Sequence, residues 1–258
     1  EELLSAVAGK EGILSLLTDT MDGEVMESAG KSLKMIANYA VGFNNIDVSA
    51  ATKRKIAVSN TPGVLTDTTA DLAMALILAV ARRIVESDIY ARAEKYMGWD
   101  PLLFMGSDVH HKTLGILGFG RVGQALAKRA AGFDMNILYH NRNRIDPEIE
   151  EEIGATYVDQ ETLLKTSDYV SIHVPLTPET TGLIDSKALT LMKPSAFIIN
   201  TARGEIIREA ELVKALAEKK IAGAGLDVFE HEPKIHPGLL KMDNVVILPH
   251  IGSASMET

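Results

Sequence analysis

The sequence contains no cysteine, and this absence excludes several kinds of chemistry. The chain forms no disulfide, and no thiolate serves as a nucleophile or a metal ligand. A chain without cysteine fits the reducing cytoplasm, where we expect this protein to act. A zinc-protease motif is also absent. His231, Glu232 and His236 do not have HExxH spacing, and Pro233 and Pro237 prevent the helix which that motif needs, so we expect no metal.

Long apolar runs and an excess of basic charge are absent as well. The longest apolar run, Leu72–Ala81, is too short to span a bilayer and is typical of a buried helix. The net charge of −9 does not favour nucleic acid or an anionic membrane as a partner. The start, Glu1–Leu3, shows no signal peptide and no initiator methionine, and the chain stops soon after Met256. We therefore expect a segment clipped at both ends.

The central motif of the 258 residues is a glycine-rich turn between a strand and a helix. The apolar residues after Thr113 lead into Gly118-Phe119-Gly120-Arg121-Val122-Gly123, and a helical pattern follows. Gly118 allows a sharp turn, Gly120 a close approach of the backbone to a pyrophosphate, and Gly123 close packing of helix on strand. The free amides at the helix start attract a diphosphate. A lone GxGxxG is weak evidence, but this context predicts dinucleotide binding.

The first third of the chain alternates strands and helices without a second glycine-rich motif. This alternation predicts a small parallel βαβ sheet. The expected strands are 12–18, 33–41 and 56–59, with helices at 21–29 and 47–53. A long helix from Thr69 to about Ala93 is expected to link this part to a second domain.

The remainder of the chain predicts a second, larger parallel sheet covered by helices. After the strand of the glycine motif, further apolar strands are expected at 135–140, 169–174, 196–200, 221–228 and 245–248. These strands are apolar on both faces, as a sheet with helices on both sides requires. The predicted class is therefore α/β, with a doubly wound, Rossmann-type sheet.

Three late strands each end near one reactive residue. Asn200 precedes Arg203, Asp227 precedes Glu232, and the last strand runs into His250. Because ligands bind beyond the carboxyl ends of parallel strands, we expect Arg203, Glu232 and His250 to converge where the dinucleotide binds.

This trio suits hydride transfer between a nicotinamide and a 2-keto or 2-hydroxy acid. The guanidinium of Arg203 can hold a carboxylate and a carbonyl, and His250 can give or take the proton. Glu232 can orient the imidazole and favour its protonated form. Taken singly, the arginine is typical of a surface, the glutamate of a solvated loop and the histidine of a sheet rim. Their recurrence at three strand ends beside a dinucleotide motif favours the redox interpretation.

These residues resemble those of the D-isomer-specific 2-hydroxyacid dehydrogenases. The matching stretches run nearly from end to end: 41–47, 68–71, 114–123, 200–204, 225–229 with Glu232-Pro233, and 249–254. Within the family the chain is most similar to the glyoxylate/hydroxypyruvate reductases, and next to the 2-ketogluconate reductases.

The resemblance implies a smaller, flavodoxin-like substrate domain at 1–69, a dinucleotide-binding domain at 70–252, and a return toward the substrate domain at 253–258. Family members have one more strand–helix unit at the start and a returning helix at the end, so we expect the smaller domain to be incomplete.

The resemblance also implies roles for single residues. Amides of Val41 and Gly42 would hold the substrate carboxylate, and Trp99 of a partner subunit would restrict the substrate's length. The family's members are dimers, paired through the dinucleotide-binding domain and the arm around Trp99, which predicts a homodimer. The expected cofactor-binding residues are Thr69, Gly118, Gly120, Arg121, Val122, Gly123, Asn141, Arg142, Arg144, Pro175, Thr201, Asp227 and Gly252.

The predicted second strand of the large sheet bears on the choice of cofactor. An NAD-specific enzyme places an acid at its end, to bond the adenosine ribose. Here Asn141, Arg142 and Arg144 stand in that region, and no acid does. A carboxylate would repel a 2′-phosphate whereas Arg142 can clamp one, so we predict a preference for NADPH over NADH, with Arg144 as a second candidate. The alternative is that both arginines only face solvent.

Other functions within the same fold stay open. Phosphoglycerate dehydrogenase is a related alternative, although it usually keeps the acid that is absent here. Formate dehydrogenase is disfavoured, because that branch uses a glutamine-type partner where this chain has Glu232. The C-terminal-binding corepressors share the fold and retain similar residues, so a dinucleotide-sensing protein without catalysis is the non-enzyme alternative.

Overall fold

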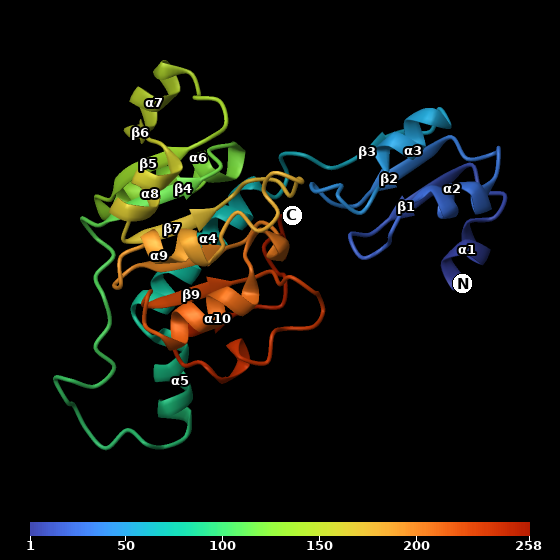
Figure 1. The fold of residues 1–258 in the computed structure, drawn as a ribbon. Helices are drawn as coiled ribbons and strands as arrows, with labels where there is room; N and C mark the ends of the chain where they lie inside the picture. The colour runs from blue at the N-terminus through green and yellow to red at the C-terminus, as the bar shows by residue number, and fades with distance from the viewer. The chain divides into compact units, whose positions relative to one another are not determined.

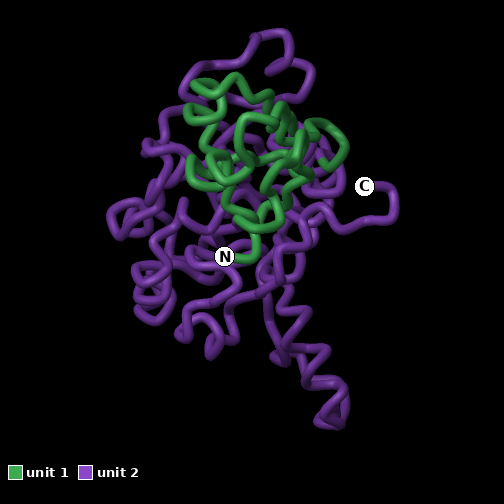
Figure 2. The backbone as a smooth tube through the Cα atoms, turned by 90° about the vertical axis from the view of Figure 1, so that its right-hand side faces the viewer, with its two compact units in different colours: residues 1–65 green, residues 66–258 purple.

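A computed structural model describes residues 1–258, and the chain divides into two compact units (Figures 1 and 2). Unit 1 is Glu1–Leu65 and unit 2 is Thr66–Thr258. The division lies before the predicted boundary at residue 69, because Thr66 already begins helix α4 (Thr66–Ala81). Thr68 and Thr69 hydrogen-bond to residues 252–258 within unit 2. The first turn of α4 therefore belongs structurally to the larger unit.

Unit 1 is a three-stranded parallel sheet with helices. The strand order is β1-β2-β3. Asp22 and Asp47 accept hydrogen bonds from the first amides of α2 and α3, which explains where these two helices begin. The core contains Met21, Met26 and Ile36. The elements are α1 (Glu2–Val7), β1 (Gly12–Ser15), α2 (Gly23–Ala29), β2 (Met35–Asn38), α3 (Val48–Lys53) and β3 (Ala57–Ser59).

Unit 2 is built on a seven-stranded, entirely parallel sheet. The spatial order is β10-β9-β8-β7-β4-β5-β6, so the chain winds outward from β4 in both directions and the strand order reverses between β4 and β7. The predicted α/β, Rossmann-type class is confirmed. The strands are β4 (Thr113–Leu117), β5 (Asn136–His140), β6 (Ala155–Tyr157), β7 (Tyr169–Ile172), β8 (Phe197–Asn200), β9 (Gly223–Leu226) and β10 (Val245–Ile247).

Helices cover both faces of this sheet. Side chains of α4 and α6 (Arg121–Ala130) form one apolar core with one face, and those of α8 (Gln160–Thr166), α9 (Ser186–Leu191) and α10 (Glu209–Ala217) form another with the opposite face (Figure 1). Along β8, Ile199 belongs to the first core and Ile198 to the second. The strands are therefore apolar on both faces, as predicted.

The predicted single helix from Thr69 to Ala93 is wrong. It is divided into α4, which ends at Ala81, and α5 (Ile84–Arg92). The carbonyl of Ala81 accepts from the amide of Ser107 at 2.8 Å, which takes the place of the next helical bond. Arg83 then adopts a left-handed conformation with φ of 52°. The helix breaks because a distant segment of chain satisfies its last carbonyl.

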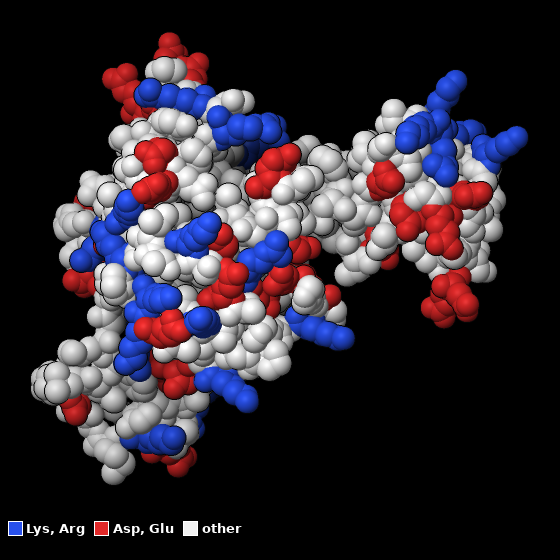
Figure 3. All heavy atoms as spheres, in the orientation of Figure 1, with Lys and Arg blue, Asp and Glu red and all other residues white.

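Strand β6 was not predicted either. Its three residues, between α7 (Pro147–Ile153) and α8, are too few to show a pattern. No helix is both long and apolar enough to cross a membrane. On the face of the molecule in Figure 3, acidic and basic side chains are interspersed.

Candidate active site

The glycine turn after β4 has the geometry that the motif requires. Gly118 has a φ of 95°, and a side chain there would lie 2.5 Å from the backbone of His173. A side chain on Gly123 would meet the carbonyl of Gly118 at 2.4 Å, so the helix sits directly on the turn. Gly120, by contrast, faces open space and caps α6 without a side-chain hydrogen bond. The first amides of α6, on Arg121 and Val122, are thus available to a diphosphate.

The loop after β8 carries Arg203 and is fixed by Asn200. The side chain of Asn200 accepts from the amide of Ala202 at 3.0 Å and donates to the carbonyl of Arg203 at 2.8 Å. Gly204 lies so close to Phe229 that any side chain would overlap its backbone. This contact brings Arg203 against the loop that follows β9. Burial lowers the pKa of Arg203, and the charges of Glu205 and Glu232 oppose that shift.

Glu232 and His250 are in direct contact. Nδ1 of His250 lies 2.7 Å from Oε2 of Glu232, and the other carboxylate oxygen accepts from the amide of Phe229 at 3.0 Å. Burial raises the pKa of Glu232, but the hydrogen bonds from His250 and Phe229 outweigh it, so its pKa is lower than usual. A carboxylate at this position makes Nδ1 the hydrogen-bearing nitrogen, which leaves Nε2 of His250 for a substrate.

Asp227 fixes the loop that contains His250 through hydrogen bonds to its backbone. This buried carboxylate accepts from the amides of Ile251 and Gly252 at 2.8 and 2.7 Å. Burial raises its pKa, although these two hydrogen bonds oppose the rise. Thr69 of α4 donates to the carbonyl of Gly252 at 3.0 Å. The predicted cofactor residues Thr69, Asp227 and Gly252 thus form one hydrogen-bonded cluster that fixes the loop following His250.

Val41 and Gly42 lie in unit 1, in the loop after β2. The carbonyl of Val41 accepts from the side chain of Asn60, and that of Gly42 from the side chain of Asn38, both at 2.8 Å. Because both carbonyls are bound, this short segment has a defined orientation. It can present its amides to a carboxylate.

The two arginines after β5 differ sharply in their surroundings. Arg144 pairs through two hydrogen bonds with Glu150 of α7, at 2.8 and 2.6 Å. Arg142 is exposed, and its charge is near enough to Glu179 to help lower the pKa of that carboxyl group. Of the two candidates for a 2′-phosphate, Arg144 is therefore already bound to a carboxylate, and Arg142 is the available one. Asn141 accepts from the amide of Phe119 at 2.6 Å and so joins this loop to the glycine turn.

The other predicted residues lie at separate positions. Pro175 is exposed after β7, and its carbonyl accepts from Thr180 at 2.6 Å. Thr201 directly follows β8, and its buried hydroxyl has no hydrogen-bond partner. Such a buried hydroxyl without a partner, at the carboxyl end of a strand, fits a site that a polar ligand completes. Trp99 lies in the segment after α5 and is 84% exposed.

Three asparagines that bind the backbone of predicted residues, two in unit 1 and one in unit 2, were not singled out from the sequence. Asn38 and Asn200 are buried at the ends of β2 and β8, and Asn60 directly follows β3. Each binds the backbone of a predicted substrate residue. The available signal was their position, since a polar side chain at the carboxyl end of a buried strand needs a partner.

Comparisons with known proteins agree with this geometry. Residues 74–252 match the family model described as D-isomer specific 2-hydroxyacid dehydrogenase, NAD binding domain. The chain is 59% identical to a glyoxylate reductase of Thermococcus litoralis, over 99% of this chain and 78% of that protein.

Two solved structures are also similar. A glyoxylate reductase from Paecilomyes thermophila is 39% identical with a TM-score of 0.91, covering 99% of this chain and 80% of that one. An NADPH-dependent glyoxylate/hydroxypyruvate reductase from Sinorhizobium meliloti, in complex with NADP and malonate, is 35% identical with a TM-score of 0.88, covering 96% and 75%. The family model, the identities and the shared fold show that this chain belongs to the D-isomer specific 2-hydroxyacid dehydrogenases.

Proposed function

We propose that this enzyme reduces a small 2-keto acid, glyoxylate or hydroxypyruvate, to the D-2-hydroxy acid. The observation that carries the proposal is the pair of Glu232 and His250, 2.7 Å apart, with the charge of Arg203 acting on the same carboxylate. A reduced nicotinamide, when bound, supplies the hydride. The residues of this chain then have to bind the acid, orient its carbonyl and provide one proton.

Each residue of the trio has one task in this reaction. Arg203 binds the substrate carboxylate and carbonyl oxygen through its guanidinium. As the carbonyl carbon receives the hydride, Nε2 of His250 gives a proton to the carbonyl oxygen, and the C=O double bond becomes an alcohol. Glu232 stabilises the protonated imidazole from the other side. We assign unit 1 as the substrate domain, in which Val41 and Gly42 bind the carboxylate, and unit 2 as the dinucleotide-binding domain.

The names of the relatives support the choice of substrate. The relatives at 59% identity in Thermococcus litoralis and 52% in Korarchaeum cryptofilum are both named glyoxylate reductase. The test is a panel of glyoxylate, hydroxypyruvate, 2-ketogluconate and phosphohydroxypyruvate, assayed for kcat/KM with NADPH and NADH. The proposal predicts the highest values for the first two acids. A preference for either larger acid contradicts it, and binding of dinucleotide without turnover would favour the corepressor alternative.

We also propose that the enzyme prefers NADPH. The support is the lack of an acid at the end of β5 and the exposed Arg142 next to it. The relative from Sinorhizobium meliloti is named as NADPH-dependent. Arg142→Ala is expected to lower the ratio of kcat/KM for NADPH over NADH. A wild-type preference for NADH that this substitution leaves unchanged would refute the proposal.

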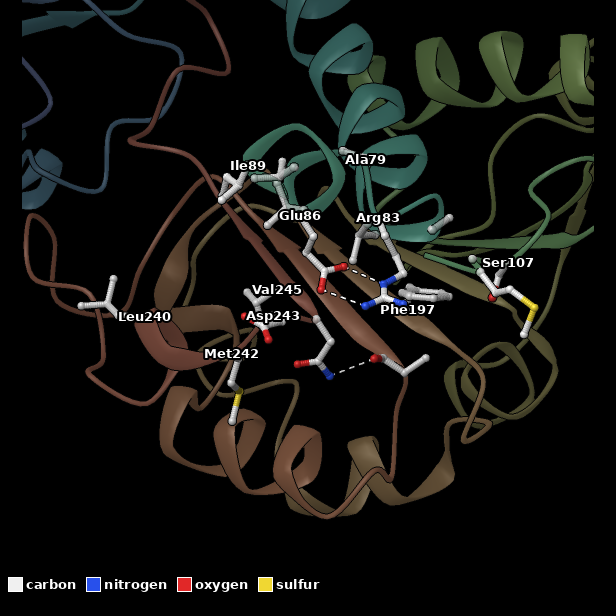
Figure 4. Close-up of a pocket in the computed structure, with 18 residues that line it drawn as sticks. Ala79, Arg83, Glu86, Ile89, Ser107, Phe197, Leu240, Met242, Asp243 and Val245 are labelled. Atoms are coloured by element: carbon white, nitrogen blue, oxygen red, sulfur yellow. Dashed lines mark hydrogen bonds and ion pairs between the residues drawn. The ribbon is translucent and has the colours of Figure 1, made fainter. Parts of the chain in front are cut away.

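We further propose a homodimer that forms through α5 and the arm after it. Tyr96, Met97 and Trp99 in this segment are between 61% and 92% exposed, which is unusual for three large apolar side chains so close together. A pocket of about 480 Å³ lies beside α5 (Figure 4). It is lined by Phe197 and Val245, the first residues of β8 and β10. The pocket therefore lies at the amino ends of these strands, whereas the catalytic trio follows the carboxyl ends. Sedimentation of the purified chain tests this proposal, with a monomer as the contradicting result.

A further inference from the structure

The loop after β5 is held in place by a cluster that has no part in the chemistry described above. Its central residue is Glu150, whose side chain is only 9% exposed. Both carboxylate oxygens of Glu150 bind Arg144, and one of them also accepts a hydrogen bond from the hydroxyl of Tyr139 on β5. That hydroxyl in turn accepts from the amide of Ile145, at 3.2 Å. The carboxylate thus links α7, β5 and the loop.

The same cluster reaches the glycine turn. The ring of Tyr139 stacks on that of Phe119, with centroids 4.4 Å apart, and Phe119 is the residue between Gly118 and Gly120. The amide of Phe119 binds Asn141 at the start of the loop. The guanidinium of Arg144 also lies over the ring of Tyr157, 5.9 Å from its centre. The loop that meets the adenosine end of a dinucleotide is therefore connected, through packed side chains, to the turn that meets its pyrophosphate.

The charge of Glu150 explains why Arg144 is committed to this cluster. The hydrogen bonds from Arg144 and Tyr139 hold the pKa of Glu150 at about 2, so the carboxylate is ionised at neutral pH. A nearly buried carboxylate without a cation would be costly, and it would repel a phosphate bound to the loop above it. The positive charge of Arg144 offsets both the cost of burying this carboxylate and its repulsion of a phosphate. Because Nε and Nη2 both bind Glu150, the guanidinium is held in a fixed orientation toward α7, and only its remaining N–H groups stay free.

We propose that Glu150 and Arg144 are positioning residues that determine cofactor choice without touching the cofactor. Their paired side chains fix the loop at residues 141–145 so that a single guanidinium, that of Arg142, meets the 2′-phosphate of NADPH. This inference rests on the proposed preference for NADPH. It proposes a positioning role for Arg144 in place of the expected role as a phosphate ligand, and it assigns a role to Glu150, which lies on a helix outside the predicted site.

The test compares kcat/KM for NADPH and NADH in Glu150→Gln, Arg144→Ala and the double variant. A glutamine keeps the shape of the side chain but turns an N–H group toward one nitrogen of Arg144, so the two-bond pair is lost. Each single variant is expected to lower the NADPH/NADH ratio about tenfold, mainly by raising KM for NADPH, because the loop no longer presents Arg142. The double variant is expected to be no worse than the more affected single variant, since both changes break one interaction.

Glu152→Gln is the matched control. Glu152 lies on the same helix, and its 3.1 Å ion pair with Lys128 is exposed on both sides, so its loss should leave the ratio unchanged. The value of kcat/KM with NADH in each variant reports whether the protein remains folded and active.

The opposite pattern would overturn the proposal. If Arg144 binds the phosphate itself, Glu150→Gln releases it, so the ratio stays the same or rises while Arg144→Ala alone lowers it. The wild type and Arg142→Ala separate the two proposals. If the wild type prefers NADH and Arg142→Ala leaves the ratio unchanged, the preference for NADPH has failed. If the wild type prefers NADPH and Arg142→Ala leaves the ratio unchanged, the role of Arg142 is wrong. If Arg142→Ala lowers the ratio and Glu150→Gln does not, only the role of Glu150 is wrong.

Discussion

Replacing Glu232 by glutamine isolates the charge that supports the proton donor. The variant keeps an oxygen that can accept from His250 and removes the negative charge, and it also replaces the oxygen that accepts from the amide of Phe229 by an NH2 group. A hydrogen bond to a charged group contributes about 1.5 to 3 kcal/mol. About a third of each side chain is exposed, with 31% for His250 and 35% for Glu232, so solvent screens the pair and the lower part of this range applies. About 1.5 to 2 kcal/mol corresponds to a decrease of about 10- to 30-fold in kcat/KM.

The dependence of kcat/KM on pH in this variant gives a second, independent test of the role of Glu232. The pKa of Glu232 is lower than usual, so the part of kcat/KM that depends on its charge is lost only as the pH falls through that lowered pKa, and the glutamine variant should lack this decline. The assay is kcat/KM for hydroxypyruvate with NADPH across the pH range. Glu230→Gln serves as a control, because Glu230 lies in the same loop but its side chain accepts from the guanidinium of Arg208 and the amide of Glu209 instead of His250. A Glu232→Gln variant with unchanged kcat/KM and an unchanged pH profile would refute the assigned role of Glu232.

Two further predictions concern other parts of the molecule. Trp99→Ala should raise the rate for a longer 2-keto acid relative to hydroxypyruvate, if Trp99 of a partner subunit limits the substrate's length; an unchanged ratio of rates contradicts this. Burial lowers the pKa of His173 from 6.5 to about 4, so neutral His173 contributes stability above pH 6.5 that is lost as the pH falls toward 4. The melting temperature of the wild type should therefore fall more steeply over this range than that of His173→Gln, and parallel curves by circular dichroism would rule this out.

Much of the fold follows from local patterns in the sequence. The alternation of apolar strands and helices predicts both sheets, and the glycine motif places the strand at which the large sheet reverses its order. The break between α4 and α5 could not be predicted in this way. It depends on the amide of Ser107, which is distant in sequence from Ala81 and satisfies its carbonyl.

In the candidate site, too, some features follow from local sequence patterns and others depend on contacts between distant residues. Arg203, Glu232 and His250 are recognisable because each follows a strand that ends at the same edge of the sheet. The sequence did not reveal that Arg144 is occupied, since its partner Glu150 is brought to it by the way α7 packs beside β5. Asn38, Asn60 and Asn200 act on backbone carbonyls, and those contacts depend on loop conformation more than on residue type.

The most direct test of the central claim is a comparison of catalysis with cofactor binding in His250→Gln. The account predicts that kcat/KM for hydroxypyruvate falls by at least about 100-fold, because the variant has no group to donate the proton, while the dissociation constant for NADPH stays close to that of the wild type. A variant that still reduces hydroxypyruvate at the wild-type rate would contradict the assignment of His250 as the acid.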